Sequence, residues 1–397
     1  MDDIGYTALH LCAERGYLDL MRLLIDEGAR VKFTELKPTD QALGNPPRAT
    51  LADEPLRLAI KNGHFECAEL LLRSGADPNA RYFLGAEINL ISPLNISFME
   101  LLLKYGADPD SRDRAGLTPL MKACRHPQGY AAAKMLIGYG ADPNAMTSER
   151  HDYRTVLHYA VLSSNVDTVR LVLNHGASVE YPPELQKPTP LDFAILRGNL
   201  EMIRLLLDNG ANVNNGSPII GLPLHIALSE KIDNKNDIVH ILLERGADPN
   251  AITLDSRGPL LKPPLGEYFN SNENVDPNLV RLLLKYGARI IIKTQFHHPL
   301  GILKSLHKLH CDTHSEVLHL IVEAAESYNG AAIKRCNLLN DRQKEFLLKH
   351  AFQPIALKHM SRLTIRQILG STGPYVIEKI DDLPVPNLIK MYLLYEV

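Results

Sequence analysis

A glycine–alanine pair recurs along most of this chain, and its spacing limits the folds that the chain can adopt. The pairs are separated by about 31 to 47 residues, and most intervals lie near the ~33-residue period of stacked helical repeats. They stand at Gly28-Ala29, Gly75-Ala76, Gly106-Ala107, Gly140-Ala141, Gly176-Ala177, Gly210-Ala211, Gly246-Ala247 and Gly287-Ala288. A unit this short cannot bury its own apolar face, so the period predicts an array of packed helix pairs.

Each pair ends an amphipathic segment. Leu20 to Leu24 and Arg204 to Leu207 are examples, and we expect both to be helical. Glycine ends such a helix in the left-handed conformation, which costs other residues more. A turn of the type Asp-Pro-Asn follows, as at Asp142-Pro143-Asn144. The second helix of each unit is therefore predicted to end at the glycine and to be followed by a tight turn.

A second motif, Thr-Pro-Leu-His or a variant of it, lies about twenty residues before most pairs. Threonine suits the start of a helix, and proline suits its first turn, where a missing N–H costs nothing. Its instances are Thr7 to His10, Thr118 to Met121, Thr155 to His158, Thr189 to Asp192 and Leu222 to His225. The histidines are expected to form structural hydrogen bonds and to have no catalytic role.

These two motifs together resemble ankyrin repeats. We count about eight repeats over residues 1–290, with a degenerate ninth at about 295–326 that would close the stack. The resemblance implies an all-α solenoid of helix pairs with short finger turns and one concave binding surface. Repeat three is short and lacks the threonine motif. Residues 32–52 form a polar insertion, either a surface loop or a target-binding element. The first repeat begins at Met1, so either it caps the array itself or the sequence lacks upstream residues.

The composition is that of an ordinary globular protein, with a net charge of −3 and no basic excess for binding nucleic acid. The five cysteines are isolated and odd in number, which argues against a disulfide framework and favours a reducing compartment. We expect no signal peptide, because Met1 to Gly5 is polar, and no membrane helix, because no apolar run approaches ~18 residues. These features predict a location in the cytoplasm, with or without the nucleus.

A different pattern occupies the C-terminal residues. Asp341 to His350 reads as one helix, and Pro354 suits the first turn of another. In this second helix Leu357, Ser361 and Ile365 recur at four-residue steps and share one face.

The stretch resembles the SOCS box, an adaptor that couples a protein to elongin B, elongin C and a cullin. In that family a small residue and a leucine are followed by a cysteine and an aliphatic residue at the spacing of Ala356, Leu357, Ser361 and Ile365. The resemblance implies that these four residues bind elongin, with Leu357 in an apolar pocket of elongin C. Serine replaces the usual cysteine at 361, and its hydroxyl would cost on the order of 1 kcal/mol when buried.

Leu383, Pro384, Val385 and Pro386 match the family's cullin element, which is typical of cullin-5 and its RING protein, with cullin-2 left open. Read without the resemblance, the four residues are a rigid linker between helices. Leu388, Ile389, Tyr392 and Leu393 follow and are expected to close the core of the box. We predict an ankyrin array at 1–326 that binds a target, a linker at 327–340 and a three-helix SOCS box at 341–397.

Finger turns are the usual binding elements of ankyrin arrays, and tyrosine and arginine are enriched in binding hot spots. The candidate target-binding residues are Tyr82, Phe83, Arg112, Arg150, His151 and Tyr153. The alternative is that Tyr82 and Phe83 pack beneath the irregular third repeat and that the charged tips are solvated.

No motif points to catalysis, a cofactor or a metal. A cluster of His307, His310, Cys311, His314 and His319 could suit zinc, but apolar residues interleave with it and favour a solvated cap turn. Phosphate loops and nucleophile motifs are missing from the sequence. The chain is therefore expected to have no chemistry of its own. The resemblance to ankyrin repeats and the SOCS box implies a substrate receptor of an elongin B/C–cullin-5 ubiquitin ligase. The alternative is a non-catalytic ankyrin scaffold that recruits no ligase.

Overall fold

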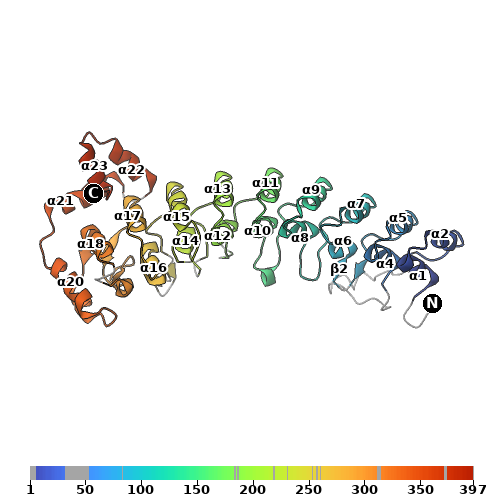
Figure 1. Ribbon diagram of the computed structural model, residues 1–397, viewed down its shortest axis with the longest axis horizontal. Helices are drawn as coiled ribbons and strands as arrows, with labels where there is room; N and C mark the ends of the chain where they lie inside the picture. Colours follow the sequence, from blue (N-terminus) through green and yellow to red (C-terminus); the bar gives the residue numbers. More distant parts are fainter. Residues whose placement is uncertain are drawn as a thin grey trace. The chain divides into compact units, whose positions relative to one another are not determined.

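The computed structural model is mostly helical (Figure 1). It describes residues 6–31, 53–82, 84–182, 185, 187–217, 220–229, 231–252, 254–255, 258–259, 261–310, 314–370 and 373–396. The predicted insertion at 32–52, Phe83 and Cys311 lie outside these residues. The chain divides into two compact units, Met1–Ser178 and Val179–Val397.

The first unit consists of antiparallel helix pairs. Its helices are α1 (Ala8–Arg15), α2 (Leu18–Asp26), α4 (Pro55–Lys61), α5 (Phe65–Arg73), α6 (Glu87–Leu90), α7 (Ile96–Lys104), α8 (Pro119–Arg125), α9 (Tyr130–Gly138), α10 (Val156–Leu162) and α11 (Val166–Asn174), with a 3₁₀ turn η1 (Glu149–His151). The short strands β1 (Arg81–Tyr82) and β2 (Gly85–Ala86) form an antiparallel hairpin.

The second unit continues the helix pairs and adds the C-terminal helices. It contains α12 (Pro190–Leu196), α13 (Leu200–Asp208), α14 (Pro223–Ser229), α15 (Lys235–Glu244), α16 (Pro264–Ser271), α17 (Pro277–Lys285), η3 (Leu303–Lys308), α18 (Ser315–Ala324), α19 (Gly330–Arg335), α20 (Asp341–Ala351), α21 (Leu357–Leu369), α22 (Pro374–Asp381) and α23 (Asn387–Leu393). Its strands are β3 (Leu254–Asp255) with β4 (Gly258–Pro259), antiparallel, and β5 (Ile290–Ile292) with β6 (Ala325–Tyr328), parallel.

The threonine motif starts helices as predicted. Thr118 is the N-cap of α8, its hydroxyl accepts a hydrogen bond from the Met121 amide, and Pro119 stands in the first turn. The histidine of the motif is structural where its contacts are described. His225 is 2% exposed and its Nε2 lies 3.0 Å from the Lys262 carbonyl oxygen in the following repeat. Burial lowers the pKa of His225, which keeps the ring neutral in this position.

The Gly-Ala turns link neighbouring repeats through an asparagine amide. Gly176 has φ +88°, a left-handed conformation, and its carbonyl oxygen accepts a hydrogen bond of 2.9 Å from Asn144 Nδ2. The amide of Ser178 donates back to Asn144 Oδ1 at 2.7 Å. The asparagine of a finger turn therefore holds both a carbonyl and an N–H of the next repeat.

Repeat three departs from the pattern, as the missing motif indicated. Its first helix, α6, has only four residues, and Glu87 in it is 4% exposed. Arg57 pairs with this buried carboxylate at 3.1 Å and also lies over the Tyr82 ring at 4.8 Å. A side-chain network thus stabilises a repeat whose first helix is too short to do so alone.

The array ends in a cap at η3 and α18, near the degenerate ninth repeat predicted at 295–326. The parallel pair β5–β6 lies beside it, and the Asn329 amide extends the pair with a bond of 3.1 Å to the Ile292 carbonyl. α20 also contacts this end of the array, because the buried Gln343 donates to the carbonyls of Leu306 and Leu309 at 3.2 and 2.6 Å. The boundary of the box at residue 341 stays a prediction.

Asp192 occupies the histidine position of the motif in α12 and is 1% exposed. Its Oδ2 accepts a hydrogen bond of 2.7 Å from the Thr189 amide, while Oδ1 has no partner among the described residues. Burial raises the pKa of Asp192 to about 7, and the Thr189 hydrogen bonds offset part of that rise. The protonated acid is therefore the form that suits this site.

We predict that Asp192→Asn removes a pH dependence of stability. The folded state holds the Asp192 proton up to a pKa of about 7, whereas the unfolded chain releases it near its ordinary value of 3.8. The folded state thus binds more protons between these values, so the free energy of unfolding should fall as pH rises from 4 to 7. Asparagine mimics the neutral acid and should stabilise the protein at pH 8 by about 1–4 kcal/mol relative to wild type, with little difference at pH 4.

Urea unfolding of both proteins at the two pH values, followed by circular dichroism, measures this difference. The exposed Asp208→Asn in α13 is the matched control. An equal effect of Asp192→Asn at pH 4 and pH 8 would contradict the prediction.

Candidate functional site

The three C-terminal helices form a small unit with its own core. Val376, Ile380, Leu393 and Leu394 are buried together, and partly buried Ile365, Leu369, Ile377 and Leu383 pack against them. The amphipathic pattern of α21 directs Ile365 and Leu369 toward this core. The core is therefore built by α21, α22 and α23; the predicted helix at 341–350 is α20, which contributes no residue to this core, and α22 was not predicted.

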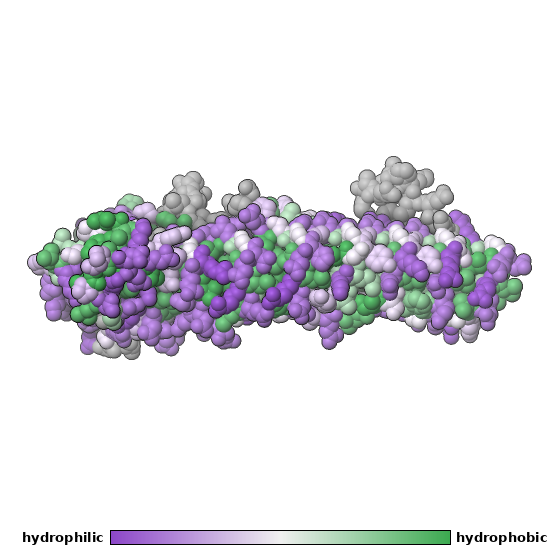
Figure 2. All heavy atoms as spheres, turned by 90° about the horizontal axis from the view of Figure 1, so that it is seen from above, coloured by the Kyte–Doolittle hydropathy of each residue, from purple (hydrophilic) through white to green (hydrophobic). Residues whose placement is uncertain are grey.

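The opposite side of this unit exposes an apolar surface. Leu357 is 80% exposed, Ile368 78% and Leu388 68%, with Met360 and Ile389 also exposed. Green hydrophobic atoms gather on the left of Figure 2, where Figure 1 places α21 to α23. Large exposed apolar patches on soluble proteins mark interaction sites, so this face is the candidate functional site.

A groove of about 410 Å³ crosses this face between α21 and α23. One wall carries Ser361 and Ile365, and the other carries Leu388, Ile389 and Tyr392. Lys358 and Arg362 stand at its polar edge, where the Lys358 Nζ lies 3.9 Å from the centre of the Tyr392 ring. The groove is mainly apolar with a cationic edge, an arrangement that suits a partner's apolar side chains.

The predicted elongin-binding residues lie together on this face. Ala356 is the N-cap of α21 and exposed, Leu357 is its first residue, and Ser361 is exposed one turn later. Ile365 is partly buried because it reaches both the groove and the core. One detail of the prediction was wrong: Pro354 precedes the helix instead of occupying its first turn, because α21 begins at Leu357.

Two residues expected to close the core do not do so. Leu393 is 2% exposed and belongs to the core, but Leu388 and Ile389 are 68% and 44% exposed. α23 has apolar residues on both sides, so its sequence alone did not show which side faces inward. Leu394, just beyond the helix, takes the core position instead.

Two buried arginines of α21 hold the unit together and attach it to the last repeat. Arg366 is 7% exposed and donates to the carbonyls of Leu284 and Lys285 at the end of α17, each at 2.9 Å. A third bond of 2.9 Å goes to the Leu393 carbonyl at the end of α23. Helix C-termini carry unsatisfied carbonyls and partial negative charge, so one guanidinium serves two helix ends without a carboxylate.

Aromatic rings complete this attachment. Arg362, 2% exposed, stacks on Tyr392 at 3.6 Å and on Tyr395 at 4.2 Å from the ring centres. Burial raises the pKa of Tyr395, and the two arginines partly offset that rise. The Gly373 amide adds a bond of 2.9 Å to the Tyr286 carbonyl. Sequence reasoning missed this cluster; the signal was the four-residue spacing of Arg362 and Arg366 on the core side of α21.

The predicted cullin element lies between α22 and α23. Leu383 packs on the core, Pro384 and Pro386 are exposed, and Pro386 is the N-cap of α23. The Val385 amide bonds to the Leu383 carbonyl at 2.8 Å, forming a tight turn. The four residues thus form a stiff link with exposed prolines, and this geometry is compatible with both of the interpretations given above.

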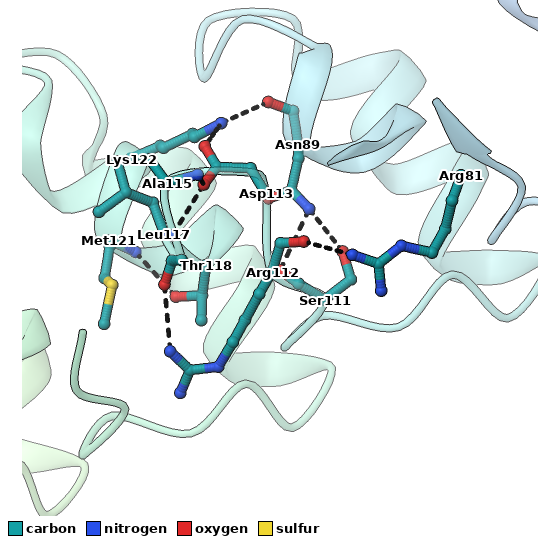
Figure 3. Close-up of polar contacts among 11 residues, drawn as sticks. Arg81, Asn89, Ser111, Arg112, Asp113, Ala115, Leu117, Thr118, Met121 and Lys122 are labelled. Carbon is teal, nitrogen blue, oxygen red and sulfur yellow. Dashed lines mark hydrogen bonds and ion pairs between the residues drawn. The ribbon is translucent and has the colours of Figure 1, made fainter. Parts of the chain in front are cut away.

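In the first unit, two predicted target-binding residues are engaged by the protein itself. Tyr82 is 6% exposed. Arg112 Nη1 donates to the Gly116 carbonyl at 3.1 Å and to the Met146 carbonyl of the next finger at 2.8 Å. Figure 3 shows Arg112 within a network that also joins Arg81, Ser111 and Asn89. Both positions favour a packing role over a contact with a partner.

The next finger turn, which contains η1, exposes more of its side chains for contact with a partner. Arg150 is exposed, and His151 and Tyr153 are partly exposed around η1. Asp152 and Tyr153 have φ of +57° and +53°, two consecutive left-handed residues that are not glycine. Each costs roughly 1–2 kcal/mol, and such strain gathers at functional sites. This finger is the best-placed part of the predicted target surface.

The predicted zinc alternative gains no geometric support. His307 and His319 lie near main-chain carbonyl oxygens of their own segment, and His314 Nε2 lies 3.1 Å from the Glu273 carbonyl oxygen. Within the described ranges, no three potential metal ligands come together. In the same ranges, every helix is too short or too polar to cross a bilayer.

Comparison with known proteins identifies both parts of the chain. The family described as Ankyrin repeats (3 copies) matches residues 1–82, 130–217 and 183–253, and the SOCS box family matches residues 353–394. The ankyrin matches together cover just over half of the chain.

Three relatives that match over just under half of this chain show what the similarity covers. Human Ankyrin repeat and SOCS box protein 16 is 32% identical over 45% of this chain and 38% of its own length. Human Palmitoyltransferase ZDHHC13 is 34% identical over 45% of this chain and 27% of its length, and Drosophila melanogaster Palmitoyltransferase Hip14 is 34% identical over 48% and 28%. The chain spans between about a quarter and two fifths of the length of these relatives. Two are named as palmitoyltransferases and the third is not, so the similarity supports the repeats and no single activity. The chain belongs to the ankyrin-repeat proteins and ends in a SOCS box, the architecture of the ankyrin repeat and SOCS box family.

Proposed function

We propose that this protein is the substrate receptor of an elongin B/C–cullin-5 ubiquitin ligase. A SOCS box implies this role. One observation supports assigning the contact to a particular residue: Leu357 is 80% exposed at the start of α21, beside an open apolar groove. Leaving so large a side chain in water costs the isolated chain stabilisation that a partner can recover. Ubiquitin transfer itself belongs to the recruited enzymes.

Leu357 is the proposed anchor for elongin C. Burying a leucine contributes roughly 1.5–3 kcal/mol, and anchors of this kind dominate binding energy. Ala356, Ser361 and Ile365 would line the contact around it. Leu383, Pro384, Val385 and Pro386 are the proposed cullin contact, since two prolines reduce the entropy lost on docking.

The proposed target surface includes the finger of Arg150, His151 and Tyr153. Its exposed side chains and left-handed backbone support this choice. The packing of Tyr82 and Arg112 makes them weaker candidates, and Phe83 lies outside the described residues. The chemistry of the target is not specified by these residues.

We predict that Leu357→Asp abolishes elongin binding. A carboxylate in an apolar pocket loses the burial of leucine and adds a desolvation cost, so affinity should fall by at least about 100-fold. Leu196→Asp is the matched control, because Leu196 is also an exposed leucine of the second unit but lies outside the box. Titration calorimetry with the elongin B/C complex measures both variants. If wild type itself fails to bind at micromolar concentrations, the proposed function is wrong.

Serine at position 361 should weaken the same contact, so Ser361→Cys is expected to strengthen it. Cysteine behaves as a small apolar residue, and removing the buried hydroxyl recovers on the order of 1 kcal/mol, or about fivefold in affinity. The same titration tests this, with Ser315→Cys outside the box as control. Unchanged or weaker binding by Ser361→Cys would show that the hydroxyl finds a partner in the complex.

A second candidate function is favoured by the arginine attachment. The box could serve as a structural cap of an ankyrin scaffold, because Arg366 bonds to the end of α17 and His359 Nε2 lies 2.9 Å from the Ala325 carbonyl oxygen. The two candidates differ in what the exposed face does, since a cap needs no Leu357 on its surface.

Arg366→Ala tests the attachment on which the structural-cap candidate rests, while elongin binding by the wild type tests the other candidate. Three carbonyl contacts are lost from a buried site, so the free energy of unfolding should fall by about 2–4 kcal/mol. Leu357→Asp should leave stability unchanged within about 0.5 kcal/mol, as expected for an exposed position. Thermal unfolding followed by circular dichroism measures both. Stability loss with intact elongin binding would show that the attachment and the recruiting surface are separate.

A further inference from the structure

A second groove, apart from the SOCS box face, opens beyond the parallel strands β5 and β6. It has a volume of about 500 Å³. Thr294 and His297 line it from the loop after β5, Lys304 from η3, and several residues between Asn329 and Leu338 from the segment after β6. Both strands of a parallel pair end at the same edge, and this brings the two loops together.

The floor of the groove is held by main-chain hydrogen bonds. The Leu303 amide bonds to the Lys293 carbonyl at 3.1 Å, and the Asn329 amide bonds to the Ile292 carbonyl at 3.1 Å. Asn329 also caps α19 by accepting from the Ala332 amide at 3.0 Å. The groove is therefore formed before any ligand arrives, which reduces the entropy cost of binding.

The charge of this groove is opposite to that of the chain. The whole protein carries a net charge of −3, yet the lining contains Lys304, Arg335 and His297 and no carboxylate. Elsewhere in the same unit, cations pair with acids: Arg289 lies 2.6 Å from Glu326 and Arg281 2.9 Å from Glu316. Lys304 and Arg335 are exposed and form no ion pair with any described residue.

Apolar surface lies next to these cations. Leu338 lines the groove and is 54% exposed. Phe296 is 94% exposed at the tip of the loop after β5, with its ring centre 5.4 Å from that of His297. An exposed aromatic next to His297, at the edge of a groove that carries unpaired cations and an exposed leucine, is typical of a protein-binding surface.

We propose that this groove binds an acidic segment of a partner protein that also carries an apolar side chain. The carboxylates would pair with Lys304 and Arg335, and the apolar side chain would cover Leu338 and Phe296. A groove of about 500 Å³ accommodates a few residues of an extended peptide. The proposal does not depend on ligase recruitment, because none of these residues belongs to the SOCS box face.

An acidic peptide fits better than a nucleic acid. Single-stranded nucleic acid requires a longer cationic track with several stacking rings, whereas the lining offers two full charges and one ring, the imidazole of His297. Oligouridylate is therefore included as a competitor in the test.

The experiment uses the full chain and a fluorescein-labelled peptide, Asp-Glu-Leu-Asp-Glu, followed by fluorescence anisotropy. Saturable binding with a Kd of about 10–100 μM is expected at about 0.15 M salt, weakening at higher salt. The neutral peptide Asn-Gln-Leu-Asn-Gln should bind at least about tenfold more weakly, because charge pairing with the two cations is lost.

Variants locate the binding. Lys304→Glu combined with Arg335→Glu should weaken peptide binding at least about tenfold, and Leu338→Asp should weaken it as well. Arg204→Glu in α13 is the matched control, an exposed arginine outside the groove, and should change binding less than about twofold. Circular dichroism checks that each variant is folded.

Several results would overturn the proposal. These are a lack of saturation up to about 1 mM peptide, equal binding of the neutral peptide, and unchanged binding by the charge-reversed variant. Displacement of the peptide by oligouridylate at lower concentration than by unlabelled peptide would also overturn it, because the groove would then prefer phosphate. Elongin binding by the charge-reversed variant is measured in parallel and should be unaffected, so failure here is distinguishable from failure of the ligase role.

Discussion

An asparagine amide that bridges successive repeats is the interaction on which the array depends. Asn79, Asn144, Asn214 and Asn250 each donate to the carbonyl of a following Gly-Ala turn at 2.8–2.9 Å and accept an amide beyond it. The arrangement requires glycine in the left-handed conformation, because that conformation ends the helix and presents the carbonyl to the finger. Helix pairs bury their apolar faces only when stacked. These asparagine hydrogen bonds therefore fix how neighbouring repeats align when their apolar contacts form.

The SOCS box uses the end of the same repeat helix. The Gly287 carbonyl accepts a hydrogen bond from Asn250 Nδ2. The carbonyls just before it also accept hydrogen bonds, those of Leu284 and Lys285 from Arg366 and that of Tyr286 from the Gly373 amide. A buried guanidinium without a carboxylate is expensive to desolvate, and burial lowers the pKa of Arg366 accordingly. Three carbonyls and the Tyr395 ring at 5.3 Å offset that cost. The exposed apolar face, with Leu357 at its start, is consequently held in a fixed position on the end of α17.

The repeat architecture and part of the candidate site could be predicted from the sequence, because their signals are periodic and local. The repeat period, the threonine caps and the Gly-Ala turns each depend on residues a few positions apart, and the structure contains them as predicted. The spacing of Leu357, Ser361 and Ile365 likewise placed them on one helix face. Contacts between distant segments were not predictable. Arg112 looks like an exposed finger residue until its bond to Met146 is known, and nothing local marks Arg366 as the partner of α17. Leu388 failed as a core residue because both sides of α23 are apolar.

The joint between array and box has an evolutionary consequence. Arg366 recognises main-chain oxygens, which every amino acid provides, so its hydrogen bonds do not depend on which side chains stand at 284 and 285. Any helix that ends in the same glycine turn presents carbonyl oxygens to which such an arginine can donate. Recombination could therefore move this C-terminal unit from one repeat protein to another, and the array upstream could diverge while the unit itself remained unaltered.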